Sequence, residues 1–525
     1  RRRRKRGTFP DPDRRVIINE LVCEGCGDCG VKSNCVSVQP VETEFGRKRR
    51  IDQSSCNKDF SCVNGFCPSF VTVHGGKLRK AAGVAGSADP LEGVPAPRQA
   101  SLAAGWSGIV DGIGGTGVVT IGAILGMAAH LEGKGCGIID MAGLAQKGGA
   151  VFSHIRIAET PEKIAAIRVS AGKADLVLGC DLVVSGNKKV LSAVREGETL
   201  FIANTAEVMP GDFARSADFS LPTERIKKAI RAAAGEGQAH FFDATRTASA
   251  LFGNSLGANM FLLGFAHQQG GLPVAAEAIE KAIELNGQAV AMNLAAFRWG
   301  RRAAHDPETV RALVERAGGG GRPPLADTLD EIVEKRAAFL TSYQDAAYAQ
   351  RYRERVASIR EAEDKAVPGS TAVSEAAARN LFKLMAIKDE YEVARLYTDG
   401  AFQKQLSAEF ESFDRLEFHL APPILGRVGS DGKPRKSRFG GWMMTGFGIL
   451  ARFKRLRGTA LDLFGYTAER RMERKLLADY EADLELVRRK LAPGQIEAAA
   501  ALLSVPALIR GFGHIKHANA EKASA

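Results

Sequence analysis

The sequence predicts a multidomain α/β protein with a mainly α-helical C-terminal domain, and three observations support this prediction. Seven of the nine cysteines lie between positions 23 and 67. From position 107 onward, short apolar runs alternate with helical patterns, as in an α/β domain with a parallel sheet. Beyond a glycine-rich break at 318–324, nearly every segment has the composition and periodicity of a helix. A chain of 525 residues also exceeds the size of a single hydrophobic core.

Changes in composition divide the chain into six segments. They are a basic arm (1–20), a Cys-rich domain (21–80), a linker (81–103), an α/β domain (104–305), a second linker (306–329) and a helical C-terminal domain (330–525).

Bulk composition excludes several classes of protein. The longest apolar-leaning run, residues 440–453, is shorter than the roughly 18 residues that a membrane span needs. The net charge is +12, but the basic run RRRRKR at 1–6 contains no aromatic residues, which favours a solvated arm over a nucleic-acid site. This run leads into TFPDPD instead of the apolar stretch of a secretory signal. We therefore expect a cytoplasmic protein that binds neither nucleic acid nor a membrane.

The Cys-rich segment has the spacing of an iron–sulfur site. Cys23, Cys26 and Cys29 form C-x2-C-x2-C, and the distant Cys67 is followed directly by Pro68. This is the arrangement of bacterial ferredoxins, in which the fourth cysteine comes from the other half of the fold. Zinc ribbons instead pair two CxxC motifs, and disulfide frameworks belong to small secreted domains. We expect a 4Fe-4S cluster on these four cysteines in a ferredoxin-like segment.

The three remaining cysteines of the segment are Cys35, Cys56 and Cys62. In a two-cluster ferredoxin they would hold a second cluster, but the spacing here is C-x5-C-x4-C-P, which leaves three thiolates where four are wanted. A 3Fe-4S cluster, a cluster with a non-cysteine ligand and no second cluster are three open alternatives.

A glycine-rich turn opens the predicted α/β domain. Gly112, Gly114 and Gly117 have the G-x-G-x-x-G spacing between a strand and a helix, and Asp140 closes the next strand. In a Rossmann-like domain this pattern binds a dinucleotide, with phosphate at the helix N-terminus and the acid on a ribose. The same glycines also serve to turn a strand tightly into a helix. An NAD-dependent oxidoreductase with a ferredoxin module is therefore one hypothesis.

The segment GIGGTGVVTIGAILG, with the later AQKGGAVFSHIRIA, ADLVLGCD and MNLAAFRWG, resembles the gamma module of the 2-oxoacid:ferredoxin oxidoreductases over about 107–301. With the cysteine segment before it and LAPPILGR, KSRFGGWM and RGTALDLFGYTAERRMER behind it, the order of parts resembles the C-terminal half of fused bacterial indolepyruvate ferredoxin oxidoreductases. In this family the glycine turn is not a nicotinamide site.

The resemblance implies a reaction and a set of partners. Family members use thiamine diphosphate with Mg to decarboxylate a 2-oxo acid oxidatively, with electrons passed through 4Fe-4S clusters to ferredoxin and the acyl group to coenzyme A. No GDG motif for thiamine diphosphate occurs in this sequence. We therefore expect the thiamine-binding module on upstream sequence or on another subunit, within a homo- or hetero-oligomer, and ferredoxin or a similar acidic acceptor as the electron partner. A non-catalytic electron-transfer or assembly subunit is the alternative.

The resemblance also points to residues that could contact an anionic ligand. The glycine turn could bind a phosphate of coenzyme A, or it could serve packing alone, and we favour packing slightly. Lys147 could bind an anionic ligand, contact another subunit or be a solvated loop residue. These candidates for cofactor binding are Gly112, Gly114, Gly115, Thr116, Gly117 and Lys147. Cys136 and Cys180 lie in apolar strand contexts and are expected to be buried thiols without a ligand role.

Overall fold

The computed structural model describes residues 9–35, 37–79, 89–142, 149–209, 213, 216–317, 325–422, 427–428 and 434–524. The chain divides into two compact units. The cysteine-rich unit comprises Arg1–Arg79, Phe213–Ala217 and Pro323–Ala525, and the α/β unit comprises Lys80–Asp212 and Asp218–Arg322. The Cys-rich segment and the C-terminal region, which the sequence suggested as separate domains, therefore belong to one unit.

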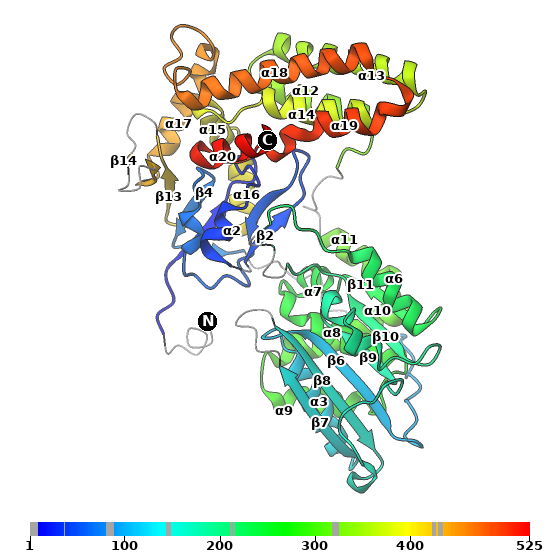
Figure 1. Ribbon diagram of the computed structural model, residues 1–525. Helices are drawn as coiled ribbons and strands as arrows, with labels where there is room; N and C mark the ends of the chain where they lie inside the picture. Colours follow the sequence, from blue (N-terminus) through cyan, green and yellow to red (C-terminus); the bar gives the residue numbers. More distant parts are fainter. Residues whose placement is uncertain are drawn as a thin grey trace. The chain divides into compact units, whose positions relative to one another are not determined.

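A mixed sheet forms the centre of the α/β unit (Figure 1). Within the described residues, its strand order is β11-β10-β9-β6-β8-β7. The strands are β6 (Trp106–Ile113), β7 (Gly135–Ala142), β8 (Ala150–Ala158), β9 (Leu176–Gly179), β10 (Leu200–Asn204) and β11 (Ala239–Phe242).

The α/β fold class is confirmed, and the expected parallel sheet is confirmed only in part, because the sheet is mixed. Strands β6, β9, β10 and β11 pair in parallel, whereas β8 is antiparallel to both β6 and β7. The reason is the short chain between β7 and β8, from Ala142 to Ala150. A parallel crossover needs a dozen or more residues, so this connection can only reverse the chain.

Helices pack on this sheet around two apolar cores. They are α3 (Val118–Leu131), α4 (Leu182–Ser185), α5 (Lys188–Leu191), α6 (Thr223–Ala234), α7 (Ala244–Phe252), α8 (Ala258–Gln268), α9 (Ala276–Asn286), α10 (Val290–His305) and α11 (Pro307–Ala317). In α8 every residue from Ala258 to His267 is buried, because this helix is apolar on nearly all sides. It packs directly against α10.

The main sheet of the cysteine-rich unit is built from two distant parts of the sequence. Its antiparallel order is β1-β4-β13-β16, with β1 (Arg14–Ile18), β4 (Phe70–His74), β13 (Arg415–Leu420) and β16 (Ser437–Phe439). Strand β1 lies within the range assigned to the basic arm. Shorter antiparallel pairs are β2 (Val38–Val41) with β3 (Lys48–Ile51), β5 (Lys77–Leu78) with β12 (Phe410–Ser412), and β14 (Arg427–Val428) with β15 (Pro434–Arg435).

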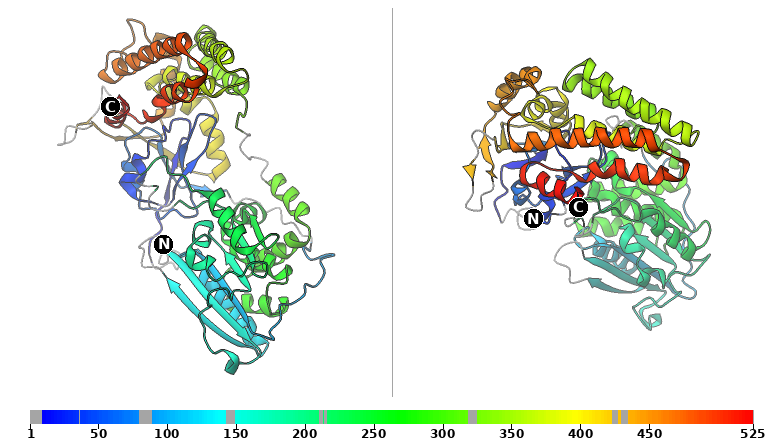
Figure 2. Two further views of the ribbon diagram at one scale, coloured as in Figure 1. Left: turned by 45° about the vertical axis from the view of Figure 1, so that its right-hand side comes forward. Right: turned by 45° about the horizontal axis from the view of Figure 1, so that its top comes forward.

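The C-terminal region is mainly helical, as predicted. After α2 (Asp28–Ser33) and the 3₁₀ turn η1 (Ser61–Asn64), the helices of this unit are α12 (Leu329–Tyr343), α13 (Ala346–Ala366), α14 (Ala372–Met385), α15 (Glu390–Thr398), α16 (Ala401–Glu409), α17 (Met443–Arg452), α18 (Ala468–Lys490), α19 (Ile496–Ser504) and α20 (Gly513–Ser524). The right-hand view of Figure 2 shows α18 beside α19. Tyr480, Leu484 and Val487 of α18 are buried against α13 and α14. In the described part of the chain, no helix has the length and apolar character that crossing a membrane requires.

Candidate functional site

Four cysteines line one small cavity in the cysteine-rich unit. Cys23 and Cys26 lie in the loop that leads into α2, Cys29 lies in the first turn of α2, and Cys67 follows η1. These are the four cysteines that the sequence suggested for one cluster. The rest of the cavity wall consists of Ile18, Glu24, Gly27, Asp28, Arg49, Gly65, Phe66, Ser69 and Phe70. Across the described residues, no three His, Cys, Asp or Glu side chains lie close enough to hold a single metal ion; the four thiols surround a space.

Glycines allow the backbone to come close to these cysteines. Gly25 has φ +68°, its N–H donates to the Cys23 Sγ at 3.3 Å, and a Cβ there would lie 2.2 Å from the Arg47 carbonyl oxygen. A Cβ on Gly65 would lie 2.8 Å from Cys29 Cα. Side chains at either position would displace the backbone that shapes the cavity.

Burial makes the thiols of this cavity poor acids. It raises the pKa of Cys26, Cys29 and Cys67, and the neighbouring cysteines raise the pKa of each further. Thiolates are the form that binds metal. Buried thiolates are stable only where positive charge compensates them, so the cavity suits a metal group flanked by cations.

Two cations lie beside the cysteines, Arg49, which is buried, and Lys436, which is partly buried. Arg49 is 1% exposed and donates to the carbonyl oxygens of Lys48 (3.3 Å) and Ala217 (2.8 Å). The Lys436 Nζ donates to the carbonyl oxygens of Gly65 (2.5 Å) and Cys67 (3.4 Å). Burial lowers the pKa of Lys436, while Cys67 and Cys29 act in the opposite direction. Both cations can offset negative charge held by the cysteines.

The C-terminal region holds the cysteine loop in place through α15 and the residues before it. The Lys388 Nζ lies 2.7 Å from the Glu24 Oε1 and donates to the Cys23 carbonyl oxygen at 3.1 Å. Although burial alone would raise the pKa of Glu24, Lys388 and Lys48 lower it well below its usual value. The Tyr397 hydroxyl donates to the Pro68 carbonyl oxygen at 2.6 Å.

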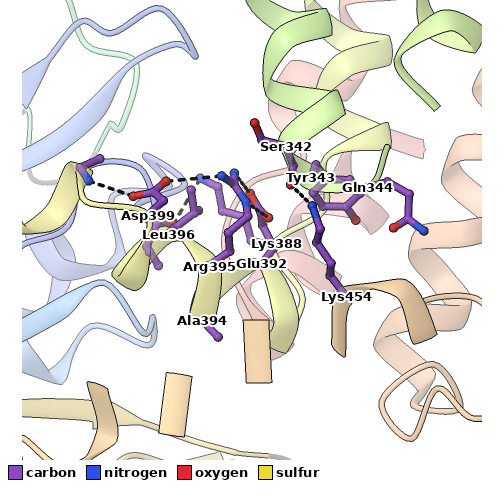
Figure 3. A network of polar contacts seen from close by, with 12 residues as sticks. Ser342, Tyr343, Gln344, Lys388, Glu392, Ala394, Arg395, Leu396, Asp399 and Lys454 are labelled. Carbon is purple, nitrogen blue, oxygen red and sulfur yellow. Dashed lines mark hydrogen bonds and ion pairs between the residues drawn. The ribbon is translucent and has the colours of Figure 1, made fainter. Parts of the chain in front are cut away.

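Ion pairs within α15 stabilise the helix itself. Figure 3 shows Arg395 reaching both Glu392, at 2.7 Å, and Asp399, at 3.4 Å. Lys454 donates to the carbonyl oxygen of Ser342 at 2.5 Å in the same view. The pairs of Arg395 lie within α15 and its C-terminal cap, and the Lys454 contact joins the segment after α17 to the end of α12.

The second group of cysteines also comes together. Cys35, Cys56 and Cys62 pack in one apolar cluster with Phe60 and Val63. Burial raises the pKa of Cys62 to about 12, and the nearby Cys35 and Cys56 contribute to this shift. The same apolar cluster also contains Cys23, Cys29 and Cys67, so the three thiols of the second group lie next to those that line the cavity.

Several polar groups of the glycine turn are engaged in hydrogen bonds within the α/β unit. The Thr116 hydroxyl donates to the Ile113 carbonyl oxygen at 2.7 Å, and the Gly114 N–H donates to the Gly149 carbonyl oxygen at 2.9 Å. A Cβ on Gly112 would lie 2.8 Å from Val118 Cγ2, so this glycine is required for packing. Gly115 and Gly117 have φ of +87° and +105°, and Gly117 begins α3.

The acid expected for a dinucleotide ribose does not lie next to this turn. Asp140 is on β7, which β8 separates from β6, and it accepts a hydrogen bond from Ser153 Oγ at 2.5 Å. In the dinucleotide fold the acid follows the strand adjacent to the glycine turn. The geometry thus weighs against the NAD hypothesis. Lys147, the remaining candidate, lies outside the described residues.

Sequence reasoning missed three charged residues at or near these candidate sites. Arg49 and Lys436 are described above; the third, Asp111, is fully buried in β6 and accepts a hydrogen bond from the Ser185 hydroxyl at 2.8 Å. Burial raises the pKa of Asp111 well above its usual value. The signal for Asp111 was an acid inside the apolar strand GIVDG. No signal in the sequence pairs Lys436 with Cys67, which precedes it by 369 positions.

Comparison with known proteins separates the chain into two matched regions. Residues 108–303 match the family described as pyruvate ferredoxin/flavodoxin oxidoreductase, and residues 329–525 match a family of unknown function (DUF6537).

Individual relatives match the first of these regions. Indolepyruvate oxidoreductase subunit IorB of Methanothermobacter thermautotrophicus is 31% identical over 197 residues, which is 37% of this chain and 95% of the relative. The subunit of the same name from Pyrococcus horikoshii is 27% identical over 38% of this chain and 95% of the relative. A solved gamma subunit of keto/oxoacid ferredoxin oxidoreductase from Geobacter sulfurreducens PCA has 24% identity over 38% of this chain and 98% of that chain, with a TM-score of 0.28.

These sequence matches define the chain as a gamma-type component of a 2-oxoacid:ferredoxin oxidoreductase. The chain belongs to the pyruvate ferredoxin/flavodoxin oxidoreductase family.

Proposed function

We propose that the cysteine-rich unit relays single electrons within a 2-oxoacid:ferredoxin oxidoreductase of the indolepyruvate type. The relay would be a 4Fe-4S cluster held by Cys23, Cys26, Cys29 and Cys67. The observation that carries this proposal is the convergence of these four thiols on one cavity. Such a cluster supplies one-electron transfer when bound.

The residues around the cysteines perform three tasks in this proposal. Phe66 and Phe70 cover the cavity and exclude water. Arg49 and Lys436 offset the charge of the thiolates. The Gly25 N–H donates to a ligand sulfur, which stabilises its negative charge. Together they favour a cluster that gains and loses an electron without moving its surroundings.

The overall reaction assigns the remaining cofactors to other parts of the enzyme. A 2-oxo acid and coenzyme A yield an acyl-CoA, CO2, a proton and two electrons, which two ferredoxins take up one at a time. Thiamine diphosphate with Mg would supply the decarboxylation chemistry from a module outside this sequence. The relatives named as subunits support assembly with other oxidoreductase subunits. Indolepyruvate is proposed as substrate because two matched relatives carry that name.

For the glycine turn we favour a packing role over a phosphate site. The contacts of Gly112 and the hydrogen bonds of Gly114 and Thr116 support this choice. Coenzyme A would then bind elsewhere in the assembled enzyme.

The proposed function is tested by iron and acid-labile sulfide analysis of anaerobically purified protein, with an EPR spectrum after dithionite reduction. The Cys26→Ala variant is expected to lose the reduced 4Fe-4S signal of this cluster together with about one to four irons per chain, because a cluster without one ligand either converts to 3Fe-4S or is lost. Cys136→Ala is the control, because this partly buried thiol packs on the core of the α/β unit. Zinc without sulfide, or unchanged iron in Cys26→Ala, would contradict the proposal.

A second prediction concerns the charge of Lys436. Lys436→Met is expected to make the reduction potential of the cluster more negative by roughly 50–100 mV. One charge at about 8 Å and an effective dielectric constant of about 20 contributes roughly 2 kcal/mol. Redox titration followed by EPR measures the shift. Lys436→Arg keeps the charge and should retain most of the potential; an equal shift in both variants would point to altered packing instead.

A further inference from the structure

The loop that carries Cys56 and Cys62 repeats the loop of the first cysteine motif. The first reads CEGCGDC at 23–29 and the second CNKDFSC at 56–62. Both have seven residues with a cysteine at each end. The middle position holds Cys26 in the first loop and Asp59 in the second. Read this way, the second motif has the spacing C-x2-D-x2-C.

The two loops also follow the same backbone path. In the first, the Gly25 N–H donates to the Cys23 Sγ at 3.3 Å, and in the second the Lys58 N–H donates to the Cys56 Sγ at 3.4 Å. The residue before the central position has φ +68° at Gly25 and φ +56° at Lys58.

The residue after the central position repeats the same geometry. Gly27 has φ +82° and Phe60 has φ +63°, and each precedes a short helix, α2 and η1 respectively. Positive φ is unfavourable at Lys58 and Phe60, which are not glycine, so the surrounding fold imposes this path. Asp59 therefore occupies the position in the second loop that Cys26 occupies in the first, where Cys26 lines the cavity.

The surroundings of Asp59 complete this correspondence. Cys35, Cys56 and Cys62 pack in one cluster of side chains, and Asp59 stands midway between Cys56 and Cys62 in the loop. A 4Fe-4S cluster needs four ligands, so three thiols leave one iron without a protein ligand. Carboxylates bind iron in proteins, although this oxygen ligand is harder than a thiolate.

Asp59 has hydrogen bonds of its own, which define the competing explanation. Its Oδ1 accepts from the Ser61 N–H at 3.1 Å and the Ser61 hydroxyl at 2.8 Å, and its Oδ2 accepts from Asn57 Nδ2 at 3.0 Å. Asp52 makes the same pair of contacts with Ser54, at 3.0 and 2.8 Å, outside the repeated loop. A turn-forming role alone would thus make the two aspartates equivalent.

We propose that Asp59 is the fourth ligand, with Cys35, Cys56 and Cys62, of a second 4Fe-4S cluster. This inference rests on the proposed function of the first four cysteines, because the second site is recognised by its likeness to the first. Asp59 is exposed, so the iron it holds is the one nearest to solvent and to an incoming or outgoing electron. Because oxygen is the harder ligand, this iron is also the one most readily lost on oxidation.

The test compares Asp59→Ala, Asp59→Cys and the control Asp52→Ala by iron and sulfide content and by EPR in the oxidised and reduced states. Wild type and Asp52→Ala are expected to hold about eight irons, and Asp59→Ala about seven, with a 3Fe-4S signal in the oxidised protein. Asp59→Cys should hold about eight irons and keep them through mild ferricyanide oxidation that converts part of the wild-type cluster to 3Fe-4S.

The outcomes separate this inference from the proposed function. Equal iron content and spectra in Asp59→Ala and Asp52→Ala would overturn the Asp59 assignment, as would a wild-type chain that holds only the cluster lost in Cys26→Ala. The Asp59 assignment would be supported if Cys26→Ala keeps a second cluster and if the double variant Cys26→Ala/Asp59→Ala alters that cluster. A chain without iron would overturn both proposals.

Discussion

Replacing Gly264 by alanine is expected to destabilise the α/β unit by roughly 3 kcal/mol or more, because overpacking of backbone against backbone cannot be relieved by a side-chain rotation. Gly264 lies in α8, where a Cβ would be 1.9 Å from the Phe297 carbonyl oxygen of α10. The reverse contact is equally close, since a Cβ on Gly300 would lie 2.1 Å from the Phe261 carbonyl oxygen. The two helices therefore meet through glycine on both sides.

Urea unfolding of the full chain, followed by circular dichroism, measures this loss. Gly448→Ala is the matched control, because Gly448 also lies in a helix, α17, but has no atom within 4 Å of its Cβ position. Alanine there should leave stability unchanged or raise it by about 0.5–1 kcal/mol through helix propensity. Similar effects of the two substitutions would show that the close approach of α8 and α10 is not what limits stability.

Replacing Glu363 by alanine is expected to destabilise the cysteine-rich unit by about 3–5 kcal/mol, because it leaves buried donors without an acceptor. Glu363 is fully buried near the end of α13. Its carboxylate accepts from the backbone N–H groups of Val373 (3.0 Å) and Ser374 (2.8 Å), in the first turn of α14. The hydroxyls of Ser374 (2.5 Å) and Ser370 (2.7 Å) donate to it as well. One carboxylate thus caps a helix that has no side-chain cap of its own.

The contribution of Glu363 should depend on pH. Burial alone would raise the pKa of this carboxyl, but its hydrogen bonds outweigh burial and lower it. A lowered pKa stabilises the folded state above the unfolded-state value of about 4.3, and this stabilisation is lost as pH falls through the folded-state pKa. The difference in unfolding free energy between wild type and Glu363→Gln should therefore be largest near pH 7 and decrease below about pH 4. Glu361→Gln, on the exposed face of the same helix, is expected to have little effect at either pH.

Sequence patterns predicted the class of each region better than the way in which strands pair. The apolar runs of β9 and β10 identified buried strands, and these pair in parallel as predicted. The error at β8 arose because apolar composition does not encode strand direction, whereas the short interval between β7 and β8 does. The division into separate domains did not anticipate that β13 and β16 complete the sheet of the Cys-rich segment, because strand pairing across more than 300 residues leaves no local signal.

The candidate site follows the same pattern. The spacing of Cys23, Cys26 and Cys29 was sufficient to predict that these three thiols line one cavity, since cysteines separated by two residues converge through local backbone geometry. In the second loop only cysteines were considered as ligands. Asp59 was therefore overlooked, although it holds the same position in that loop as Cys26 in the first. Lys436 could not be found from the sequence, because its place beside Cys67 depends on the fold of the C-terminal region.

The amino-acid sequence by itself determined the two groups of cysteines, the glycine turn and the helical character of the C-terminal region, because each depends on residues close together in the chain. The tertiary structure alone decided which distant strands pair, that α8 and α10 meet through Gly264 and Gly300, and that Lys436 lies beside Cys67. Each of these depends on close approach between segments that are far apart in the chain, and neither residue type nor periodicity records such an approach.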